Sequence, residues 1–394
     1  MKYNFNEIID RTGTHSVKWD KLPEGAQPDT LPLWVADMDF GCPEPVLDAL
    51  HKRIDRKIFG YTIYDSDRLK NAVYSWFKRR YGWDIDKSWI FFSPGIVTGF
   101  SLLINILTQE GDGVIIQKPV YNPFTDRVEA NKRVVINNSL LRQGSRYVMN
   151  FEDLEKKFAD PKNKGMILCS PHNPVGRVWT EDELLNLVSI AKKYDKWIIS
   201  DEIHCDLTRP GKKHIPLLKA APEYRERIIV CTAPSKTFNI PGLQFSNLII
   251  PNKEYQEKWQ YFTCNKTALG DGCNPLSLEA TIAAYTEGGE WLDQAMEYID
   301  GNIRYVEGFL KENLPKAALI DCEGTFLVWV DLRAYCGDPK KLKQIMIHDA
   351  KLFLNQGYIF GEEGAGYVRI NLATQRQNVV ECMERMKKTL LNIQ

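Results

Sequence analysis

The 394-residue sequence has no excess of charge of either sign, because its 51 lysines and arginines balance 51 aspartates and glutamates. That balance gives no support to binding of nucleic acid or of an anionic membrane surface. No apolar run is long enough to span a bilayer. The first residues lack the apolar stretch of a signal peptide, so we expect a cytoplasmic protein without nucleic-acid or membrane partners.

The sequence also lacks the cysteine spacing of a zinc site or of a disulfide-stabilised domain. Its nine cysteines are scattered, and no two of them form a Cys-x-x-Cys pair. Cys169 and Cys231 lie within apolar runs, where a thiol packs as a small hydrophobic side chain. An odd number of cysteines in this distribution predicts a reducing cytoplasm and no metal site.

What the sequence does contain is a regular alternation of short apolar runs with amphipathic segments. The apolar runs cover residues 90–93, 114–117, 166–169, 197–200, 228–232 and 247–250. Continuous apolar runs are typical of strands that are covered on both faces. A helix is expected at 181–194, because Thr180 and Glu183 have the spacing of a capping box. The alternation predicts an α/β fold with a mostly parallel sheet sandwiched by helices, in which ligands bind at the carboxyl ends of the strands.

After residue 275 the pattern changes to that of a smaller α+β domain. We expect Ser277 to cap a helix there. The further elements expected are a long helix at 290–312, strands at 325–331 and 367–372, and a helix at 376–392. Because the chain is long enough for more than one core, we predict a large domain of residues 46–285 and a smaller domain of residues 1–45 and 286–394.

Lys236 is the most informative single residue, because it directly follows the apolar run 228–232. Burial penalises the charged ammonium and lowers the pKa of a lysine towards that of a reactive amine. A neutral amine is what Schiff-base formation with an aldehyde cofactor requires. If Lys236 holds pyridoxal phosphate, the chain must also supply an acid for the pyridine nitrogen, donors for the phosphate and a cation for a carboxylate.

Three polar features follow other predicted strands. Asp201 ends the run 197–200 and can pair with a protonated pyridine nitrogen, although an Asp that caps the next turn is the more frequent case. Asn173 can donate its amide to a ring hydroxyl oxygen, although an Asn-Pro turn alone would explain it. The segment 93–99 opens an apolar helix, and free N–H groups at such a helix start bind anions.

Tyr121 and Arg369 complete the candidate set. Tyr121 follows the run 114–117 in a proline-rich loop, where it can stack on a cofactor ring or simply pack. Arg369 alternates with Val368 and Ile370, so it lies on the other face of a predicted strand. It is either a solvated arginine or a two-pronged clamp for a substrate α-carboxylate. Each feature is weak alone, but together they supply the parts of a cofactor site.

Five motifs, taken together, are characteristic of one enzyme family. They are Trp34-Val35-Ala36-Asp37-Met38-Asp39-Phe40, Pro171-His172-Asn173-Pro174-Val175-Gly176, Ser200-Asp201-Glu202-Ile203-His204, Ser235-Lys236-Thr237-Phe238-Asn239 and Val368-Arg369-Ile370-Asn371. The last four resemble the fold-type-I aminotransferase superfamily of pyridoxal-phosphate enzymes. The first is similar to the signature of the MalY/PatB branch of bacterial cystathionine β-lyases, or C–S lyases. The resemblance covers nearly the whole chain.

The resemblance implies a role for each central residue. Lys236 would form the Schiff base and act as the base at the substrate Cα, and Asp201 would be the partner of the pyridinium. Asn173 would donate to the ring hydroxyl and contact the substrate. Tyr121 would stack on the cofactor ring, and Arg369 would bind the substrate α-carboxylate.

The resemblance also implies contacts at the edges of the site. The phosphate would be bound by Gly95, Ile96, Val97 and Ser235. Trp34 and Asp37 would line the substrate pocket, and Tyr61 would reach the phosphate of a neighbouring subunit, which implies a homodimer with shared active sites. Two residues depart from the common aminotransferase pattern: Gln244 replaces an arginine near the phosphate, and His204 replaces a tyrosine. His204 is expected either to contact the cofactor or to be a buried core histidine.

The implied function is that of a pyridoxal-phosphate-dependent C–S β-lyase, which cleaves cystathionine or related cysteine S-conjugates to a thiol, pyruvate and ammonia. An aminotransferase that passes an amino group to a 2-oxo acid is the alternative, because both reactions use the same residues up to removal of the Cα proton. A regulatory binding role is the alternative of another class, since some members of this branch also bind regulators. No sequence feature marks a partner surface.

Overall fold

A seven-stranded sheet forms the centre of the computed structural model, which describes residues 2–267, 269 and 272–393. The strands lie in the order β2 (Ile90–Ser93), β10 (Ser246–Ile249), β9 (Ile228–Thr232), β8 (Trp197–Asp201), β7 (Asn163–Cys169), β3 (Gly113–Ile116) and β4 (Val134–Asn137). β10 is antiparallel to both of its neighbours, and the other pairs of adjacent strands are parallel. The prediction of a mostly parallel sheet is therefore confirmed.

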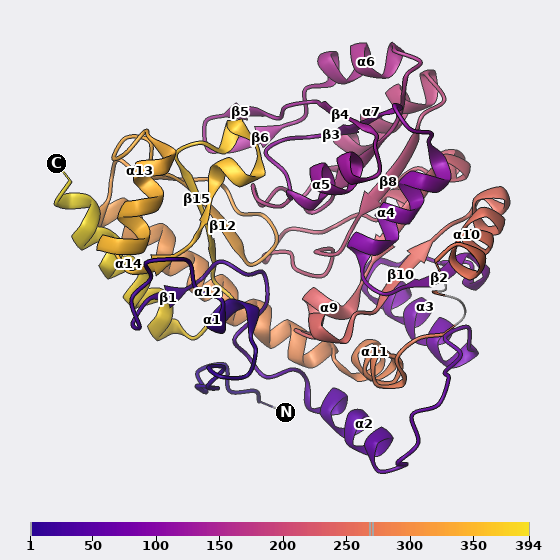
Figure 1. The fold of residues 1–394 in the computed structure, drawn as a ribbon, viewed down its shortest axis with the longest axis horizontal. Coiled ribbons are helices and arrows are strands. Elements are labelled where there is room, and N and C mark those ends of the chain that lie inside the picture. Colours follow the sequence, from indigo (N-terminus) through magenta and orange to yellow (C-terminus); the bar gives the residue numbers. More distant parts are fainter. Residues whose placement is uncertain (1, 268, 270–271, 394) are drawn as a thin grey trace.

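Alternate residues of each central strand pack into two separate cores, one on each face of the sheet. In β8, for example, Ile198 belongs to one core and Ile199 to the other. One face is covered by α4 (Ile96–Leu107), α5 (Pro123–Ala130) and α10 (Lys253–Asn265). The other is covered by α3 (Asp67–Tyr81), α6 (Phe151–Ala159), α7 (Glu181–Lys193), α8 (Leu217–Ala220) and α11 (Pro275–Glu287). Burial on both faces explains why these strands read as continuous apolar runs (Figure 1).

The C-terminal part of the chain builds a second, antiparallel sheet. Its strands lie in the order β11 (Ala318–Leu319), β12 (Leu327–Asp331), β15 (Tyr367–Asn371) and β14 (Asn355–Gln356). The helices of this part are α12 (Gly289–Asn313), α13 (Pro339–Gln344) and α14 (Arg376–Leu391). Strand β1 (Leu31–Pro32) pairs with β13 (Leu352–Phe353), so the N-terminal segment lies beside these elements (Figure 1).

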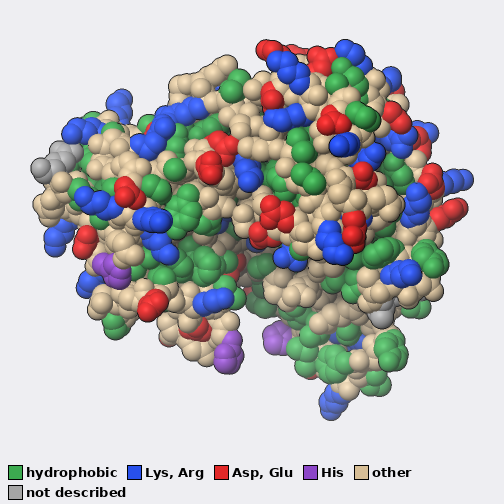
Figure 2. All heavy atoms as spheres, turned by 45° about the horizontal axis from the view of Figure 1, so that its top comes forward, with side chains coloured by type: hydrophobic (Ala, Val, Ile, Leu, Met, Phe, Trp, Pro, Cys, Tyr) green, Lys and Arg blue, Asp and Glu red, His purple; other side chains and the backbone are tan. Residues whose placement is uncertain are grey.

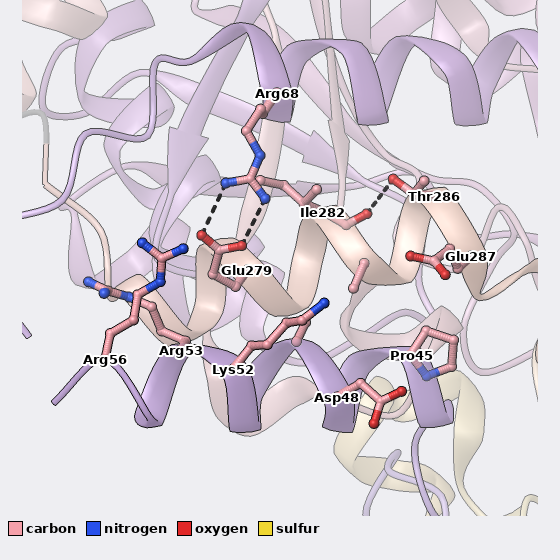
Figure 3. Close-up of a pocket in the computed structure, with 12 residues that line it drawn as sticks. Pro45, Asp48, Lys52, Arg53, Arg56, Arg68, Glu279, Ile282, Thr286 and Glu287 are labelled. Atoms are coloured by element: carbon pink, nitrogen blue, oxygen red, sulfur yellow. Dashed lines mark hydrogen bonds and ion pairs between the residues drawn. The ribbon is translucent and has the colours of Figure 1, made fainter. Parts of the chain in front are cut away.

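Short elements connect these layers. They are α1 (Val17–Asp20), α2 (Glu44–Ile54), α9 (Pro234–Thr237), the hairpin β5 (Leu141–Gln143) and β6 (Arg146–Val148), the 3-10 turns Lys87–Trp89, Pro222–Arg227, Pro241–Leu243, Gly357–Phe360 and Glu362–Gly364, and the π-helical turn Ile345–Asp349. Helix α2 packs across α11, and Figure 3 shows the open polar groove between them. At one side of this groove Arg68 of α3 donates two hydrogen bonds, of 3.2 and 2.9 Å, to Glu279 of α11.

The predicted N-terminal cap is confirmed for α7 and is wrong for α11. The Thr180 hydroxyl accepts from the N–H of Glu183, and the Glu183 carboxylate accepts from the N–H of Thr180, as the capping box predicts. The prediction that Ser277 caps α11 was wrong. Asn274 is the cap, with its Oδ1 2.9 Å from the N–H of Leu276, because Pro275 favours the first helical position. The Ser277 hydroxyl donates instead to the Leu243 carbonyl.

The surface of the protein mixes both signs of charge. Figure 2 shows lysines and arginines interspersed with aspartates and glutamates over the visible face, as their equal numbers suggest. No helix within the described part of the chain is long and apolar enough to cross a membrane. The same residues contain no group of three or more His, Cys, Asp or Glu side chains that could hold a metal ion.

Candidate active site

A cavity of about 320 Å³ opens where β2, β7, β8 and β9 end, at the carboxyl edge of the central sheet. It is lined by Ala36, Pro94, Gly95, Ile96, Val97, Thr98, Tyr121, Cys169, Asn173, Asp201, Ile203, His204, Ser235, Lys236, Pro241 and Gln244. Most of the residues that the sequence singled out are therefore brought together from separate segments of the chain. The volume lies at the lower end of the range of small-molecule sites.

Lys236 enters this cavity from α9, the short helix that follows β9 without a long loop. Its Nζ donates a hydrogen bond of 2.6 Å to the carbonyl oxygen of Ala36. Desolvation lowers the pKa of Lys236 to about 8, with the charge of Arg369 acting in the same direction. The carboxylates of Asp37 and Asp201 oppose this shift. A lysine with such a pKa is partly neutral near physiological pH and can act as a nucleophile or as a base.

Asp201, at the end of β8, is a buried carboxyl group that lacks a cationic partner. Its side chain accepts a hydrogen bond of 3.1 Å from the N–H of Ile203, and no lysine or arginine of the described residues forms an ion pair with it. Burial raises the pKa of Asp201 to about 7, although the nearby charge of Lys236 lowers it. A protonated pyridine nitrogen would supply the missing positive charge, so this residue fits that ligand.

An anion cradle lies at the start of α4. Gly95 precedes the helix with φ +99°, a conformation that side-chain-bearing residues rarely adopt, and no heavy atom lies near the position of its missing Cβ. The first N–H groups of this 12-residue helix have no carbonyl partner within the helix, which makes them donors for a phosphate. Ser235 and Gln244 line the same cavity. This donor set fits the phosphate of pyridoxal phosphate.

Tyr121 and Asn173 lie next to each other at the cavity wall. The N–H of Tyr121 donates to the Asn173 carbonyl over 3.1 Å, and desolvation by burial raises the pKa of the Tyr121 hydroxyl. The side-chain oxygen of Asn173 accepts from Arg369, so its amide nitrogen is left as the donor, and that nitrogen has no other hydrogen bond among the described residues. Both positions agree with the expected stacking and donor roles, which remain predictions.

Arg369 is not a solvated arginine, because only 5% of it is exposed. Its Nη1 donates to Asn173 Oδ1 over 2.9 Å, and its Nη2 donates to the Trp34 carbonyl over 2.8 Å and to the Asn355 side chain. Its Nε is buried without a partner, and no carboxylate of the described residues pairs with it. Burial lowers the pKa of Arg369 to about 10. A buried guanidinium held only by neutral acceptors is suited to bind a carboxylate.

Four of the predicted site residues lie outside the cavity lining. One is Arg369, which contacts the lining through its hydrogen bond to Asn173, and the others are Trp34, Asp37 and Tyr61. The indole of Trp34 donates to the Lys18 carbonyl over 3.1 Å, and only its backbone oxygen contacts Arg369. The Asp37 carboxylate forms a two-oxygen ion pair with Arg11 instead of pointing at an open pocket. Tyr61 is fully exposed. The roles proposed for these residues in substrate and phosphate binding stay predictions.

His204, whose role the sequence left undecided, and Cys169 both line the cavity. His204 is 3% exposed, lines the cavity and has a buried Nδ1 without a partner among the described residues. Burial lowers the pKa of His204 to about 3, and the charges of Lys236 and Arg369 add to this effect, so the imidazole is neutral. Cys169 is buried in an apolar core, as the sequence predicts, and it also lines the cavity. Its position at the end of β7, in register with Asp201, is the signal that identifies it.

The chain is similar to several characterised proteins along its whole length. The model of the aminotransferase class I and II family matches residues 28–386. The cystathionine β-lyase PatB of Bacillus subtilis is 40% identical over 98% of this chain and 100% of its own. A pyridoxal-phosphate-bound putative aminotransferase from Clostridium difficile is 42% identical, with a TM-score of 0.94 over 99% of this chain and 100% of its own.

A third comparison points to the same branch. The pyridoxal-phosphate-bound C–S lyase of Staphylococcus hominis is 38% identical, with a TM-score of 0.93 over 99% of each chain. This full-length similarity agrees with the geometry of the site, in which a lysine, a carboxylate and the N-terminus of α4 meet at the same edge of the sheet. The chain therefore belongs to the aminotransferase class I and II family of pyridoxal-phosphate enzymes, in the branch that contains PatB.

Proposed function

We propose that the protein is a pyridoxal-5′-phosphate-dependent C–S β-lyase, which cleaves cystathionine or a related cysteine S-conjugate to a thiol, pyruvate and ammonia. The observation that carries this proposal is that Lys236 and Asp201 line one cavity, with Arg369 hydrogen-bonded to Asn173 of its wall, in a chain that is similar to PatB over its full length. The first two residues suit the cofactor, and the third suits an amino-acid substrate.

The described residues fit the cofactor at each of its polar groups. When bound, it supplies an electron sink that stabilises a carbanion at the substrate Cα. Asp201 would accept a hydrogen bond from the pyridinium nitrogen, and Asn173 would donate to the ring hydroxyl oxygen. The N-terminus of α4 and Ser235 would bind the phosphate.

Lys236 and Arg369 act on different groups of the substrate. Arg369 binds the α-carboxylate through the N–H groups that its other contacts leave unused, on Nε and Nη1, and so fixes the orientation of the Cα–H bond relative to the lysine. Lys236 then removes the Cα proton, for which its amine must be neutral. Because burial brings the pKa of Lys236 to about 8, a useful fraction of the amine is neutral near physiological pH.

The function can be tested with cystathionine as the sole substrate. In the absence of any 2-oxo acid, the protein should release pyruvate and a free thiol in equal amounts. Lys236→Ala should release neither. No pyruvate from the wild-type protein, with amino transfer appearing once a 2-oxo acid is added, would overturn the lyase proposal.

Amino transfer to a 2-oxo acid is the second candidate, because one relative of 42% identity is described as a putative aminotransferase. The same residues would serve both reactions up to removal of the Cα proton. Amino transfer leaves the cofactor in its amine form when no 2-oxo acid is present. Loss of the visible cofactor band during a single turnover, without pyruvate release, would therefore favour this candidate.

We also propose a homodimer with shared active sites. Lys236 is the one lysine or arginine among the described residues that line the cavity, so further phosphate contacts would come from outside the subunit. Apolar side chains are exposed at the end of α2 and before α3: Ile54, Ile58, Phe59, Tyr61 and Ile63. Figure 2 shows hydrophobic side chains gathered on the projection at the lower right, where Figure 1 places α2. Exposed apolar patches of this kind mark association surfaces.

A subunit-mixing experiment tests the shared site. In a heterodimer of Lys236→Ala and Tyr61→Ala subunits, one site would receive Lys236 from one subunit and Tyr61 from the other. Mixing equal amounts of two variants that are poorly active on their own should therefore restore up to about a quarter of the wild-type activity, because about half of the dimers are mixed and each mixed dimer has one complete site. A mixture no more active than its components would show that Tyr61 does not act across the interface.

The two-domain division and the cytoplasmic location are also proposed. The division at residues 46–285 is supported by the separate central and C-terminal sheets. The location is supported by the nine cysteines, none of which forms a disulfide although two of them are only partly buried and one is exposed. Limited proteolysis would test the first, and the thiol count of the freshly isolated protein would test the second.

A further inference from the structure

Two cations and two carboxylates form a network beside Lys236. The network is buried at Lys18 and Asp39 and partly exposed at Arg11 and Asp37. Arg11 donates to both oxygens of Asp37, over 3.1 and 2.7 Å, and to Asp39 over 2.8 Å. The Nζ of Lys18 lies 2.6 Å from Asp39 and 3.9 Å from Asp37. Lys18 is completely buried and the side chain of Asp39 is 3% exposed. Charges this far from water are tolerated only when they are paired, so each member depends on the others.

The network holds a segment of backbone, residues 34–40, against the candidate active site. Every backbone carbonyl of this segment accepts a hydrogen bond from a side chain. Trp34 O accepts from Arg369, Val35 O and Asp37 O from Asn371, Ala36 O from Lys236, Met38 O from Arg11 and Asn239, Asp39 O from Gln375, and Phe40 O from Asn239. Two of these donors, Lys236 and Arg369, are the proposed base and the proposed carboxylate clamp. The position of the segment therefore determines what both of them contact.

We propose that Arg11 is a positioning residue for Lys236. Its bidentate ion pair with Asp37 fixes segment 34–40, so that the carbonyl oxygen of Ala36 contacts the Lys236 amine. The same ion pair compensates the negative charge of Asp37, which would otherwise act on that amine. Arg11 is suited to this role because its planar guanidinium group donates hydrogen bonds to Asp37, to Asp39 and to the Met38 carbonyl at the same time. The proposal deepens the proposed function, since it presupposes that Lys236 holds the cofactor.

The charges that face Lys236 come from three elements. Asp37 belongs to segment 34–40, Asp201 to β8 and Arg369 to β15, and the neutral His204 lies on the same cavity wall. Desolvation lowers the pKa of Lys236, whereas Asp37 is the strongest influence that raises it. An Asp37 carboxylate without Arg11 would hold a proton on the lysine nitrogen more firmly. A neutral residue at position 37 would lower the proton affinity of that nitrogen. Loss of Arg11 and neutralisation of Asp37 should therefore change it in opposite directions.

The visible band of the holoenzyme reports this effect without any substrate. Its titration with pH follows the proton on the nitrogen that Lys236 contributes to the bound cofactor. In Arg11→Met the midpoint should rise by about one pH unit, and in Asp37→Asn it should fall by a similar amount. The double variant Arg11→Met/Asp37→Asn should return towards the wild-type midpoint, and Arg11→Lys should lie between the wild type and Arg11→Met. Lys21→Met removes an exposed cation of the same N-terminal segment and should leave the midpoint unchanged.

The outcomes separate this proposal from the proposed function. A wild-type protein without a visible band would overturn the proposed function itself. A wild-type band whose midpoint does not move in the variants, or moves in the same direction in Arg11→Met and Asp37→Asn, would overturn the positioning role alone. If Arg11→Met does not fold, Asp37→Asn and Arg11→Lys decide the question, because their midpoints are still required to move in opposite directions.

Discussion

Replacing Arg369 should remove most of the preference of the enzyme for substrates that carry an α-carboxylate. The guanidinium is 5% exposed, is held by Asn173 and by the Trp34 carbonyl, and pairs with no carboxylate of the described residues. A substrate carboxylate can therefore accept hydrogen bonds from the two N–H groups left unused, on Nε and Nη1, and compensate the buried charge. Arg369→Lys keeps the charge but offers a single donor nitrogen. Arg369→Met keeps the approximate size and offers neither.

The size of the effect follows from the hydrogen bonds at stake. A hydrogen bond to a charged group contributes about 1.5–3 kcal/mol, and about 1.4 kcal/mol corresponds to a tenfold change in rate or affinity. Arg369→Lys loses one of two such bonds, so kcat/KM for cystathionine should fall about 10- to 150-fold. Arg369→Met loses both and leaves the Asn173 oxygen without its donor, so the fall should be about 150-fold or more.

The assay compares a substrate that carries the α-carboxylate with an inhibitor that lacks it. Pyruvate release from cystathionine gives kcat/KM, and competitive inhibition by an S-alkyl cysteamine, which lacks the carboxylate, gives the control. The inhibition constant of the cysteamine and the visible cofactor band should change little in either variant. The reasoning is refuted if Arg369→Lys stays within about threefold of the wild type, or if it weakens the two ligands equally.

Three further predictions concern charge at the site and in the second sheet. Lys236→Ala should lose the visible cofactor band and at least about 10³-fold of kcat, and in the wild-type protein kcat/KM should fall as the pH drops below about 8, checked by spectra and by a pH profile. Asp201→Asn should lower kcat about 10²-fold or more and let the cofactor dissociate on dialysis, because a neutral amide does not stabilise a pyridinium. Burial acts to raise the pKa of Asp331, but hydrogen bonds from Arg333 and Arg142 lower it to about 2. Because that folded-state pKa lies below the unfolded value, Asp331→Asn should cost about 2 kcal/mol in urea denaturation at neutral pH, and the difference should shrink as the pH falls from about 4 to about 2.

Much of the fold could be predicted because strands that are buried on both faces appear in the sequence as continuous apolar runs. Each of the six predicted apolar runs corresponds to a strand of the central sheet within a few residues. The seventh strand, β4, was missed because it lies at the edge, where Val134 is exposed and no continuous apolar run is required. The start of α11 was misassigned because Ser277 has the hydroxyl of a cap, while Asn274 and Pro275 supply the actual one.

For the candidate site, too, the residues at the ends of strands could be predicted from the sequence, and the others could not. Asp201, Asn173 and Lys236 follow strands, so the rule for parallel sheets locates them without a structure. Trp34 and Asp37 come from a segment without regular structure, and nothing in their sequence reveals that their side chains bind Lys18 and Arg11. Such contacts depend on tertiary packing between distant segments, which local patterns do not encode.

The partnerless groups of the site explain why a cofactor and an amino acid belong there together. Arg369 lacks a carboxylate, Asp201 lacks a cation, and His204 Nδ1 lacks any partner, all within the described residues. Leaving charges buried and unpaired is costly, and a fold that needed only stability would have neutralised them. Elsewhere in the chain it does so: the neighbouring network compensates Asp37 and Asp39 with Arg11 and Lys18. The uncompensated charges are a cation on β15 and an acid at the end of β8, which are complementary to a carboxylate and to a protonated ring nitrogen. Ligand binding therefore completes a charge balance that the polypeptide alone leaves open.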